Sequence, residues 1–262
     1  MAVERIWADN AARNFHYLVA CEATGEALAI DPLNWQAVLA RAQARGWRIT
    51  QILNTHEHWD HIGGNEPLRS ATGATLLAHA GAVARIPGVD RTLAAGDVIT
   101  VGRSVQLRCL DTPGHTLTHI CAYDESEPAL FCGDTLFNAG VGNCHNGGDP
   151  ALLYDTFRTQ LAALPPATRV YPGHEYFARN LGFTLAVEPG NSAAAALLEQ
   201  CSHLAADDMP ITTLAQEREV NAFFRLEQPQ IIATVQRSHQ PASERPTARD
   251  VFLALRALRN RW

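Results

Sequence analysis

Residues 49–64 read ITQILNTHEHWDHIGG, and this stretch carries the most information about fold and chemistry. The apolar run at its start predicts a buried β-strand, and the two glycines at its end predict a turn. Three histidines and one aspartate lie between them, at His56, His58, Asp60 and His61. On a tight loop these side chains can converge on one metal or divide between adjacent metals. Because neutral imidazole and carboxylate suit Zn²⁺, Fe²⁺ or Mn²⁺, the stretch predicts a metal-binding loop between a strand and a helix.

Three further candidate ligands follow β-like runs later in the chain. His115 lies in TPGHT, Asp134 in LFCGDT and His174 in YPGHEY. Each motif alone is weak, because a Gly-His pair after a strand is common at an ordinary turn. Together with the first loop they supply five histidines and two aspartates, which is enough for two metal ions. An acidic residue is also suited to bridge two such ions.

Length and composition restrict the class of protein. The 262 residues are 47% hydrophobic with a net charge of -6, which excludes a disordered chain and allows a sizeable core. No apolar run approaches the roughly 18 residues of a membrane helix. The mildly acidic balance disfavours nucleic-acid binding. All 21 basic residues are arginine, which excludes P-loop and Schiff-base chemistry that depends on lysine.

The N-terminus and the cysteines indicate a cytoplasmic protein. The opening sequence MAVERIWADN lacks the basic start and apolar run of a secretory signal. The six cysteines are scattered, with no C-x-x-C pair, and are not a disulfide framework for a chain of this length. We therefore expect a reducing compartment and no membrane partner. The oligomeric state is left open.

The hydrophobic pattern predicts a strand-rich first part and a helical end, with the change near residues 175–180. The predicted strands cover 14–21, 27–31, 49–55, 74–79, 98–101, 105–112, 119–123, 129–132 and 169–171. The predicted helices cover 35–44, 149–164, 192–204, 213–221, 230–238 and 247–260. This order suggests two packed sheets flanked by helices, followed by a helical subdomain.

In order and local context, the four ligand motifs resemble those of the metallo-β-lactamase superfamily, over residues 14–176. Later motifs extend a resemblance to glyoxalase II (hydroxyacylglutathione hydrolase) over nearly the whole chain. These motifs are GHEY at 173–176, VEP at 187–189 with Asn191, NAFFR at 221–225 and LRALRNRW at 255–262.

The resemblance implies an α+β fold, the metallo-β-lactamase αβ/βα sandwich with a C-terminal helical subdomain. Residues 1–175 would form the metal-binding hydrolase domain and residues 176–262 the substrate-binding subdomain. The seven candidate ligands would bind two divalent ions, with zinc expected and iron or manganese as alternatives. The implied ligands are His56, His58 and His115 at the first metal and Asp60, His61 and His174 at the second, with Asp134 bridging both.

The implied activity is hydrolysis of a glutathione thioester. S-D-lactoylglutathione would yield D-lactate and glutathione, the glyoxalase II step of methylglyoxal detoxification. A metal-bound hydroxide would attack the thioester carbonyl, and a thiol of pKa about 8.5–9 departs readily as thiolate. Asp60 and Asp134 would orient the hydroxide as well as bind metal. The sequence has no G-x-S-x-G serine elbow, and this chemistry requires none.

Five residues are candidate contacts to the thiol carrier. Arg256 and Arg259 are three apart on the last predicted helix and are therefore expected to share a face. The resemblance implies that they bind the glycine carboxylate of glutathione, and that Tyr176 contacts the tripeptide. Asn143 and His145 stand where the family tends to have a basic and an aromatic residue. Their identity leaves the thiol carrier and the acyl preference open.

Other activities share the superfamily motifs. The first alternative is a persulfide dioxygenase-like enzyme that uses one iron and oxygen. Hydrolysis of another thioester, a lactone, a β-lactam or RNA is the second, and a non-catalytic metal-binding protein is the third.

For the remaining histidines and for Cys144 we expect structural or surface roles. Cys144 with His145 could form a metal or redox pair, although a surface turn fits better. His119 is expected to be a neighbour of the ligands or a core residue. The histidines without ligand-like context are His16, His79, His203 and His239.

Overall fold

The computed structural model describes residues 1–238 and 245–262, and His239 lies outside them. The chain divides into two compact units, which we name unit 1 and unit 2. Unit 1 comprises Met1–Thr112, Thr118–Gly133 and Tyr171–Glu175. Unit 2 comprises Pro113–Leu117, Asp134–Val170 and Tyr176–Trp262.

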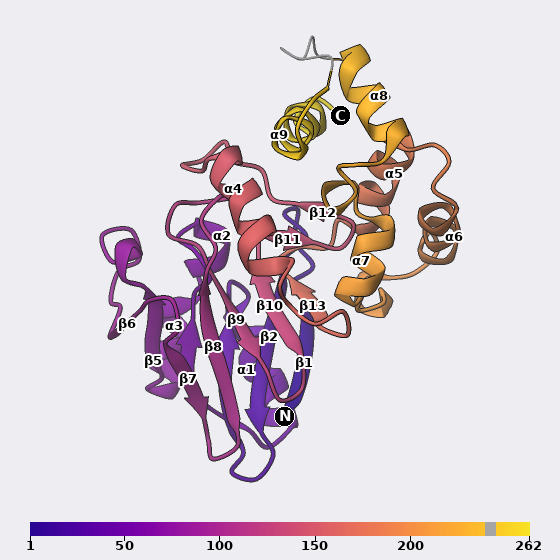
Figure 1. Cartoon of the computed structure of the whole chain (residues 1–262). Coiled ribbons are helices and arrows are strands. Elements are labelled where there is room, and N and C mark those ends of the chain that lie inside the picture. The colour runs from indigo at the N-terminus through magenta and orange to yellow at the C-terminus, as the bar shows by residue number, and fades with distance from the viewer. Residues whose placement is uncertain (239–244) are drawn as a thin grey trace. The chain divides into compact units, whose positions relative to one another are not determined.

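Unit 1 is built on two β-sheets. The six strands of the first sheet follow chain order: β1 (Ala2–Trp7), β2 (Phe15–Cys21), β3 (Glu26–Ile30), β4 (Arg48–Leu53), β5 (Thr75–His79) and β6 (Arg91–Leu93). The second sheet has the order β13 (Arg169–Pro172), β10 (Ala129–Gly133), β9 (Ile120–Asp124), β8 (Val105–Asp111) and β7 (Val98–Val101). Strands β7 to β10 run side by side as antiparallel neighbours (Figure 1). The helices of this unit are α1 (Trp35–Ala44), α2 (Trp59–Ile62), α3 (Asn65–Thr72) and the short 3₁₀ turn η1 (Ala80–Ala82).

Strand β2 shows why the two sheets pack together. Its residues Tyr17 and Val19 belong to the core between the sheets, whereas Leu18 and Ala20 belong to the core under α1 and α3. This period of two is the geometry of a strand that is buried on both faces. Across the inner core the Tyr17 and Phe131 rings meet edge to face, with centroids 5.6 Å apart. The predicted pair of packed sheets is therefore confirmed.

Unit 2 is mainly helical. A two-stranded hairpin, β11 (Leu136–Phe137) and β12 (Gly140–Val141), precedes the helices. The helices are α4 (Pro150–Thr156), continued by the π-helical turn η2 (Phe157–Leu161), then α5 (Phe177–Val187), α6 (Ser192–Cys201), α7 (Leu214–Val220), α8 (Pro229–Ser238) and α9 (Ala248–Arg259). The 3₁₀ turns η3 (Ala206–Asp208) and η4 (Ala222–Phe224) connect them. Asp149 caps α4 through the Ala151 amide, with Pro150 in the first turn, as the sequence predicts.

Every predicted strand and helix is present, with ends shifted by a few residues. Elements that the pattern did not predict include the sheet-edge strands β1 and β6 and the helices α3 and α5. None of the helices in the described part of the chain is long and apolar enough to cross a bilayer.

Buried His16 makes stability depend on pH. The ring lies in the core on β2, and its Nε2 accepts a hydrogen bond from the Asn34 amide at 3.0 Å. Burial lowers the pKa of His16 to about 4, whereas an unfolded histidine titrates near 6.5. Between these values the unfolded chain binds more protons, so folding stability falls as the pH falls from 6.5 to 4, by about 3 kcal/mol.

Replacing His16 with Gln should therefore flatten this part of the stability profile, because glutamine keeps an acceptor but does not titrate. The measurement is the free energy of unfolding in urea at pH 6.5 and at pH 4.5. The exposed His203→Gln variant serves as control and should keep the wild-type difference. An equal difference in both variants would show that His16 does not carry the pH dependence.

Candidate metal centre

The loop after β4 carries His56 and His58 and leads into α2, which carries Asp60 and His61. The segment that follows α2 packs closely against the chain that follows β3. A Cβ at Gly64 would lie 1.8 Å from the Pro32 carbonyl oxygen, so only glycine fits there. The predicted strand–loop–helix arrangement is confirmed.

Asp60, His61 and His174 bring three ligand atoms together in unit 1. The two histidine Nε2 atoms are 3.2 Å apart. Oδ2 of Asp60 lies 3.6 Å from Nε2 of His61 and 3.5 Å from Nε2 of His174. Ligand atoms bound to a tetrahedral ion at about 2.0–2.2 Å are about 3.3–3.6 Å from one another. The spacing and the donor types therefore fit a divalent metal ion.

In both His61 and His174 the second ring nitrogen, Nδ1, has a hydrogen-bond partner. Nδ1 of His61 lies 2.9 Å from an Asp31 carboxylate oxygen, and Nδ1 of His174 lies 2.7 Å from the Ala12 carbonyl oxygen. Because both partners accept, Nδ1 carries the hydrogen and Nε2 keeps its lone pair for a metal. Asn14 donates to Oδ2 of Asp60 at 3.1 Å and orients that carboxylate.

Asp31 is the residue that the sequence reasoning missed. Its carboxylate accepts from the Thr55 amide at 2.8 Å and from the Thr55 hydroxyl at 2.6 Å, in addition to its contact with His61. Its backbone adopts φ +48°, a left-handed conformation that aspartate tolerates better than most residues. A signal was available, because Asp31 ends a β-like run just as the other candidate aspartates and histidines follow one.

His56 and His58 lie on the loop between β4 and α2. Nε2 of His56 is 3.1 Å from Nδ1 of His58, and the His56 ring stacks on His119 with centroids 5.0 Å apart. His119 is buried, and its Nδ1 lies 2.9 Å from the Thr112 hydroxyl. The expectation that His119 is a neighbour or core residue is confirmed.

Unit 2 holds the two remaining candidate ligands. Nε2 of His115 lies 3.4 Å from Oδ2 of Asp134, and Nδ1 of His115 lies 2.5 Å from the Asn143 carbonyl oxygen. Gly142 lets the loop approach both residues, since a Cβ there would be 2.0 Å from the Asp134 carbonyl oxygen. Five candidate ligands thus gather in unit 1 and two in unit 2.

The two candidate arginines have different surroundings. Arg256 is only 4% exposed and donates to the carbonyl oxygens of Val141 and Gly142, both at 3.1 Å. Arg259 is half-buried, with its guanidinium 5.4 Å from the Trp262 ring centroid and 3.2 Å from the Asn180 side-chain oxygen. Burial, with the nearby charge of Arg179, lowers the pKa of Arg259. A bound anion would relieve both effects.

The other substrate candidates lie at the ends of elements. Tyr176 precedes α5, with its ring edge to face against Phe137 at 5.4 Å. Asn143 and His145 are exposed, and the Asn143 side chain accepts from the His145 amide at 3.1 Å. Burial raises the pKa of the Cys144 thiol to about 11, which keeps it protonated at neutral pH and argues against a metal or redox pair.

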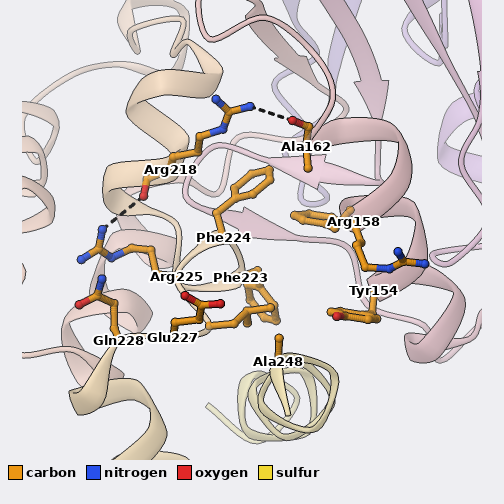
Figure 2. Close-up of a pocket in the computed structure, with 12 residues that line it drawn as sticks. Tyr154, Arg158, Ala162, Arg218, Phe223, Phe224, Arg225, Glu227, Gln228 and Ala248 are labelled. Atoms are coloured by element: carbon orange, nitrogen blue, oxygen red, sulfur yellow. Dashed lines mark hydrogen bonds between the residues drawn. The ribbon is translucent and has the colours of Figure 1, made fainter.

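A hollow of about 450 Å³ lies elsewhere in unit 2 (Figure 2). Its walls include the Phe157 and Phe224 rings, whose centroids are 4.9 Å apart. Its arginines are engaged inside the unit: Arg225 pairs with Glu188 at 2.6 Å, and Arg218 donates to the Ala162 carbonyl at 3.3 Å. The hollow contains no candidate ligand, so the chemistry is assigned elsewhere.

Comparisons with known proteins agree with these motifs. The profile of the Metallo-beta-lactamase superfamily matches residues 16–174, and that of the Hydroxyacylglutathione hydrolase C-terminus matches residues 175–262. Two proteins named hydroxyacylglutathione hydrolase align over 263 residues and 100% of each chain. The one from a Polaromonas species is 58% identical, and the one from Nitrosococcus oceani is 55% identical.

Among solved structures, ETHE1 from Myxococcus xanthus superposes with a TM-score of 0.69 at 24% identity, over 99% of this chain and 98% of that one. At this identity the likeness concerns the fold alone, and it supports the metallo-β-lactamase α+β fold. The full-length relatives and the C-terminal profile are more specific. The chain belongs to the hydroxyacylglutathione hydrolase family of the metallo-β-lactamase superfamily.

Proposed function

We propose that this protein hydrolyses S-D-lactoylglutathione to D-lactate and glutathione with two divalent metal ions, zinc in the first instance and iron or manganese as alternatives. The observation that carries the proposal is the group formed by Asp60, His61 and His174. Its ligand atoms have the spacing of a metal site, and the partners of both rings leave the Nε2 atoms available. Membership of the hydroxyacylglutathione hydrolase family supports the substrate.

The other four candidate ligands would complete the metal centre. His56, His58 and His115 would hold the first ion, and Asp134 would bridge to the second. Within unit 2 the His115 Nε2 and the Asp134 Oδ2 are 3.4 Å apart, the spacing of two ligands of one ion, which supports this assignment. All seven candidates also lie within residues 16–174, the part matched by the superfamily profile.

We also propose that the chain is divided by function at residue 175. Residues 1–175 would bear the metal ligands, and residues 176–262 would bind the thiol carrier. The junction of the two family profiles at residues 174 and 175 supports it.

The reaction would need little from the protein beyond positioning. Two divalent ions at this site would lower the pKa of a water molecule to about 7 and polarise the thioester carbonyl. The Asp60 and Asp134 carboxylates would accept a hydrogen bond from the attacking oxygen and aim it at the carbonyl carbon. Because a thiolate of pKa about 8.5–9 departs without protonation, no general acid is required. The described thiols and hydroxyls therefore need no nucleophilic role.

Arg259 and Tyr176 would bind the glutathione part of the substrate, and Asn143 and His145, on the loop between β12 and α4, would also contact it. The cation of Arg259 lies beside two aromatic rings, with 5.8 Å to the Phe183 centroid and 5.4 Å to that of Trp262. This placement orients a positive charge without neutralising it, which suits a carboxylate ligand. A cytoplasmic location fits the thiol carrier, and the six cysteines are all unpaired by disulfides.

The decisive measurement combines metal content with two activity assays on the purified protein. We expect two metal ions per chain, thiol release from S-D-lactoylglutathione and no oxygen uptake with glutathione persulfide. Oxygen uptake with one iron per chain would instead assign a persulfide dioxygenase. Less than one ion per folded chain would contradict the two-metal site.

Asp31 should control metal affinity through His61. In Asp31→Asn the acceptor of the His61 Nδ1 hydrogen is replaced in part by an amide donor, so the ring loses its fixed tautomer. Metal affinity should fall about 10–100-fold, as for other partners of metal-binding histidines. Metal retained after dialysis against a graded chelator series measures this. The exposed Asp208→Asn variant should retain metal like the wild type, and equal retention in both variants would exclude the orienting role of Asp31.

Arg259 should control substrate affinity. Replacing it with Met keeps much of the apolar contact with the rings but removes the cation. Because a hydrogen bond to a charged group contributes about 1.5–3 kcal/mol, KM should rise about tenfold or more while kcat stays nearly constant. Initial rates with S-D-lactoylglutathione check this, and the exposed Arg261→Met variant is the matched control. An unchanged KM in Arg259→Met would remove this residue from the binding site.

A further inference from the structure

The chain between Asp134 and α4 is held, residue after residue, by side chains from the helices of unit 2. Asn180 of α5 donates to the Asn138 carbonyl oxygen at 3.0 Å. The Ala139 amide donates to the Glu217 carboxylate of α7 at 2.8 Å. Ala139 has φ +56°, which is unfavourable for a residue with a Cβ, so this contact stabilises a conformation that the chain would otherwise avoid.

The same pattern continues through the next three residues. Asn221 donates to the Gly140 carbonyl oxygen at 3.1 Å and to Glu217 at 3.0 Å. Arg256 of α9 then donates to the carbonyl oxygens of the two residues that follow, Val141 and Gly142. The backbone from 138 to 142 thus has a side-chain partner at every residue. We call this set, Asn180, Glu217, Asn221 and Arg256, the loop clamp.

The residue after the clamped segment contacts a candidate metal ligand. The Asn143 carbonyl oxygen lies 2.5 Å from Nδ1 of His115. A carbonyl can only accept, so this contact places the hydrogen on Nδ1 and leaves Nε2 as the metal-binding atom. The orientation of the His115 ring therefore depends on where the loop presents one main-chain oxygen.

The loop clamp contains a buried carboxyl group and a buried guanidinium that act on one stretch of backbone. Glu217 is fully buried and Arg256 nearly so. Peptide groups lie between them, with an N–H directed at the carboxylate and two C=O groups directed at the guanidinium. Burial raises the pKa of Glu217 to about 7, opposed by hydrogen bonds from Thr212, Asn221 and the Ala139 amide. Burial lowers the pKa of Arg256 to about 10, so it stays charged at neutral pH.

We infer that the loop clamp positions a metal ligand: Arg256, with Glu217 and Asn221, fixes the Asn143 carbonyl and through it the tautomer and direction of His115. Arg256 is therefore a positioning residue for the metal centre and not a carboxylate anchor, in contrast to Arg259. This inference rests on the proposed function for the ligand role of His115. Its consequence is that metal affinity and kcat depend on Arg256, whereas KM does not.

The test compares Arg256→Met with Arg259→Met in the full-length protein. Metal affinity is measured by chelator competition, and kcat and KM by thiol release from S-D-lactoylglutathione. For Arg256→Met we expect a loss of about 10–100-fold in metal affinity, a lower kcat and a KM within about twofold of wild type. Arg259→Met should keep the metal affinity of the wild type. A raised KM with unchanged metal affinity in Arg256→Met would overturn the inference and restore the anchor role.

Two further measurements separate positioning from a general loss of folding. Arg256→Lys keeps a buried cation and part of the donors, so its metal affinity should lie between those of the wild type and Arg256→Met. Long-range ¹H–¹⁵N correlation spectra of the metal-free protein report the His115 tautomer directly. We expect the Nδ1-protonated form in the wild type and a mixture in Arg256→Lys. A wild-type tautomer and wild-type metal affinity in Arg256→Lys would contradict the loop clamp.

These readouts also distinguish this inference from the proposed function. If the wild type released no thiol from S-D-lactoylglutathione, the proposed function would fail. The metal affinity and the His115 tautomer would still report whether Arg256 positions the ligand.

Discussion

A histidine that binds a metal must present one ring nitrogen with a lone pair, so its other nitrogen must donate to an acceptor that does not move. Three of the candidate histidine ligands satisfy this requirement. His61 donates to the Asp31 carboxylate, and His174 and His115 donate to main-chain carbonyl oxygens. A carbonyl cannot rotate to find its donor as a side chain can. The direction of two ligands is therefore set by the course of the backbone.

The two sheets of unit 1 fix the position of the backbone on both sides of the His174 contact. The Phe15 amide at the start of β2 donates to the Gly173 carbonyl at 2.8 Å, and an isolated bridge joins Asn14 to His174. The segment before β2 and the segment after β13 are thereby aligned before any metal binds. Ala12, whose carbonyl oxygen accepts from His174, lies on the first of these segments. A ligand mounted on rigid elements keeps its geometry better than one on a free loop.

The sequence alone predicted the features that depend on residues close together in the chain. Residue types and spacing were sufficient to predict the metal-binding loop. His115, Asp134 and His174 were selected as candidates because each follows a β-like run of the sequence. The edge strands β1 and β6 were missed because β1 carries the charged residues Glu4 and Arg5 and β6 has only three residues, and edge positions demand less apolar patterning. The role of Asp31 was missed because its partners His61 and Thr55 are 30 and 24 residues away.

Helix α9 shows why a matching residue type does not fix a role. Phe252, Leu255 and Arg256 lie on its buried face, so at the centre of this face a cation replaces an apolar side chain. A desolvated guanidinium is tolerated only where several acceptors meet it, and the carbonyl groups of the β12 segment supply them. Arg259 lies one turn later, where the helix ends and its side chain reaches solvent. Two arginines on one helical stripe thus differ because burial changes within a single turn, and helical periodicity carries no information on where the core stops.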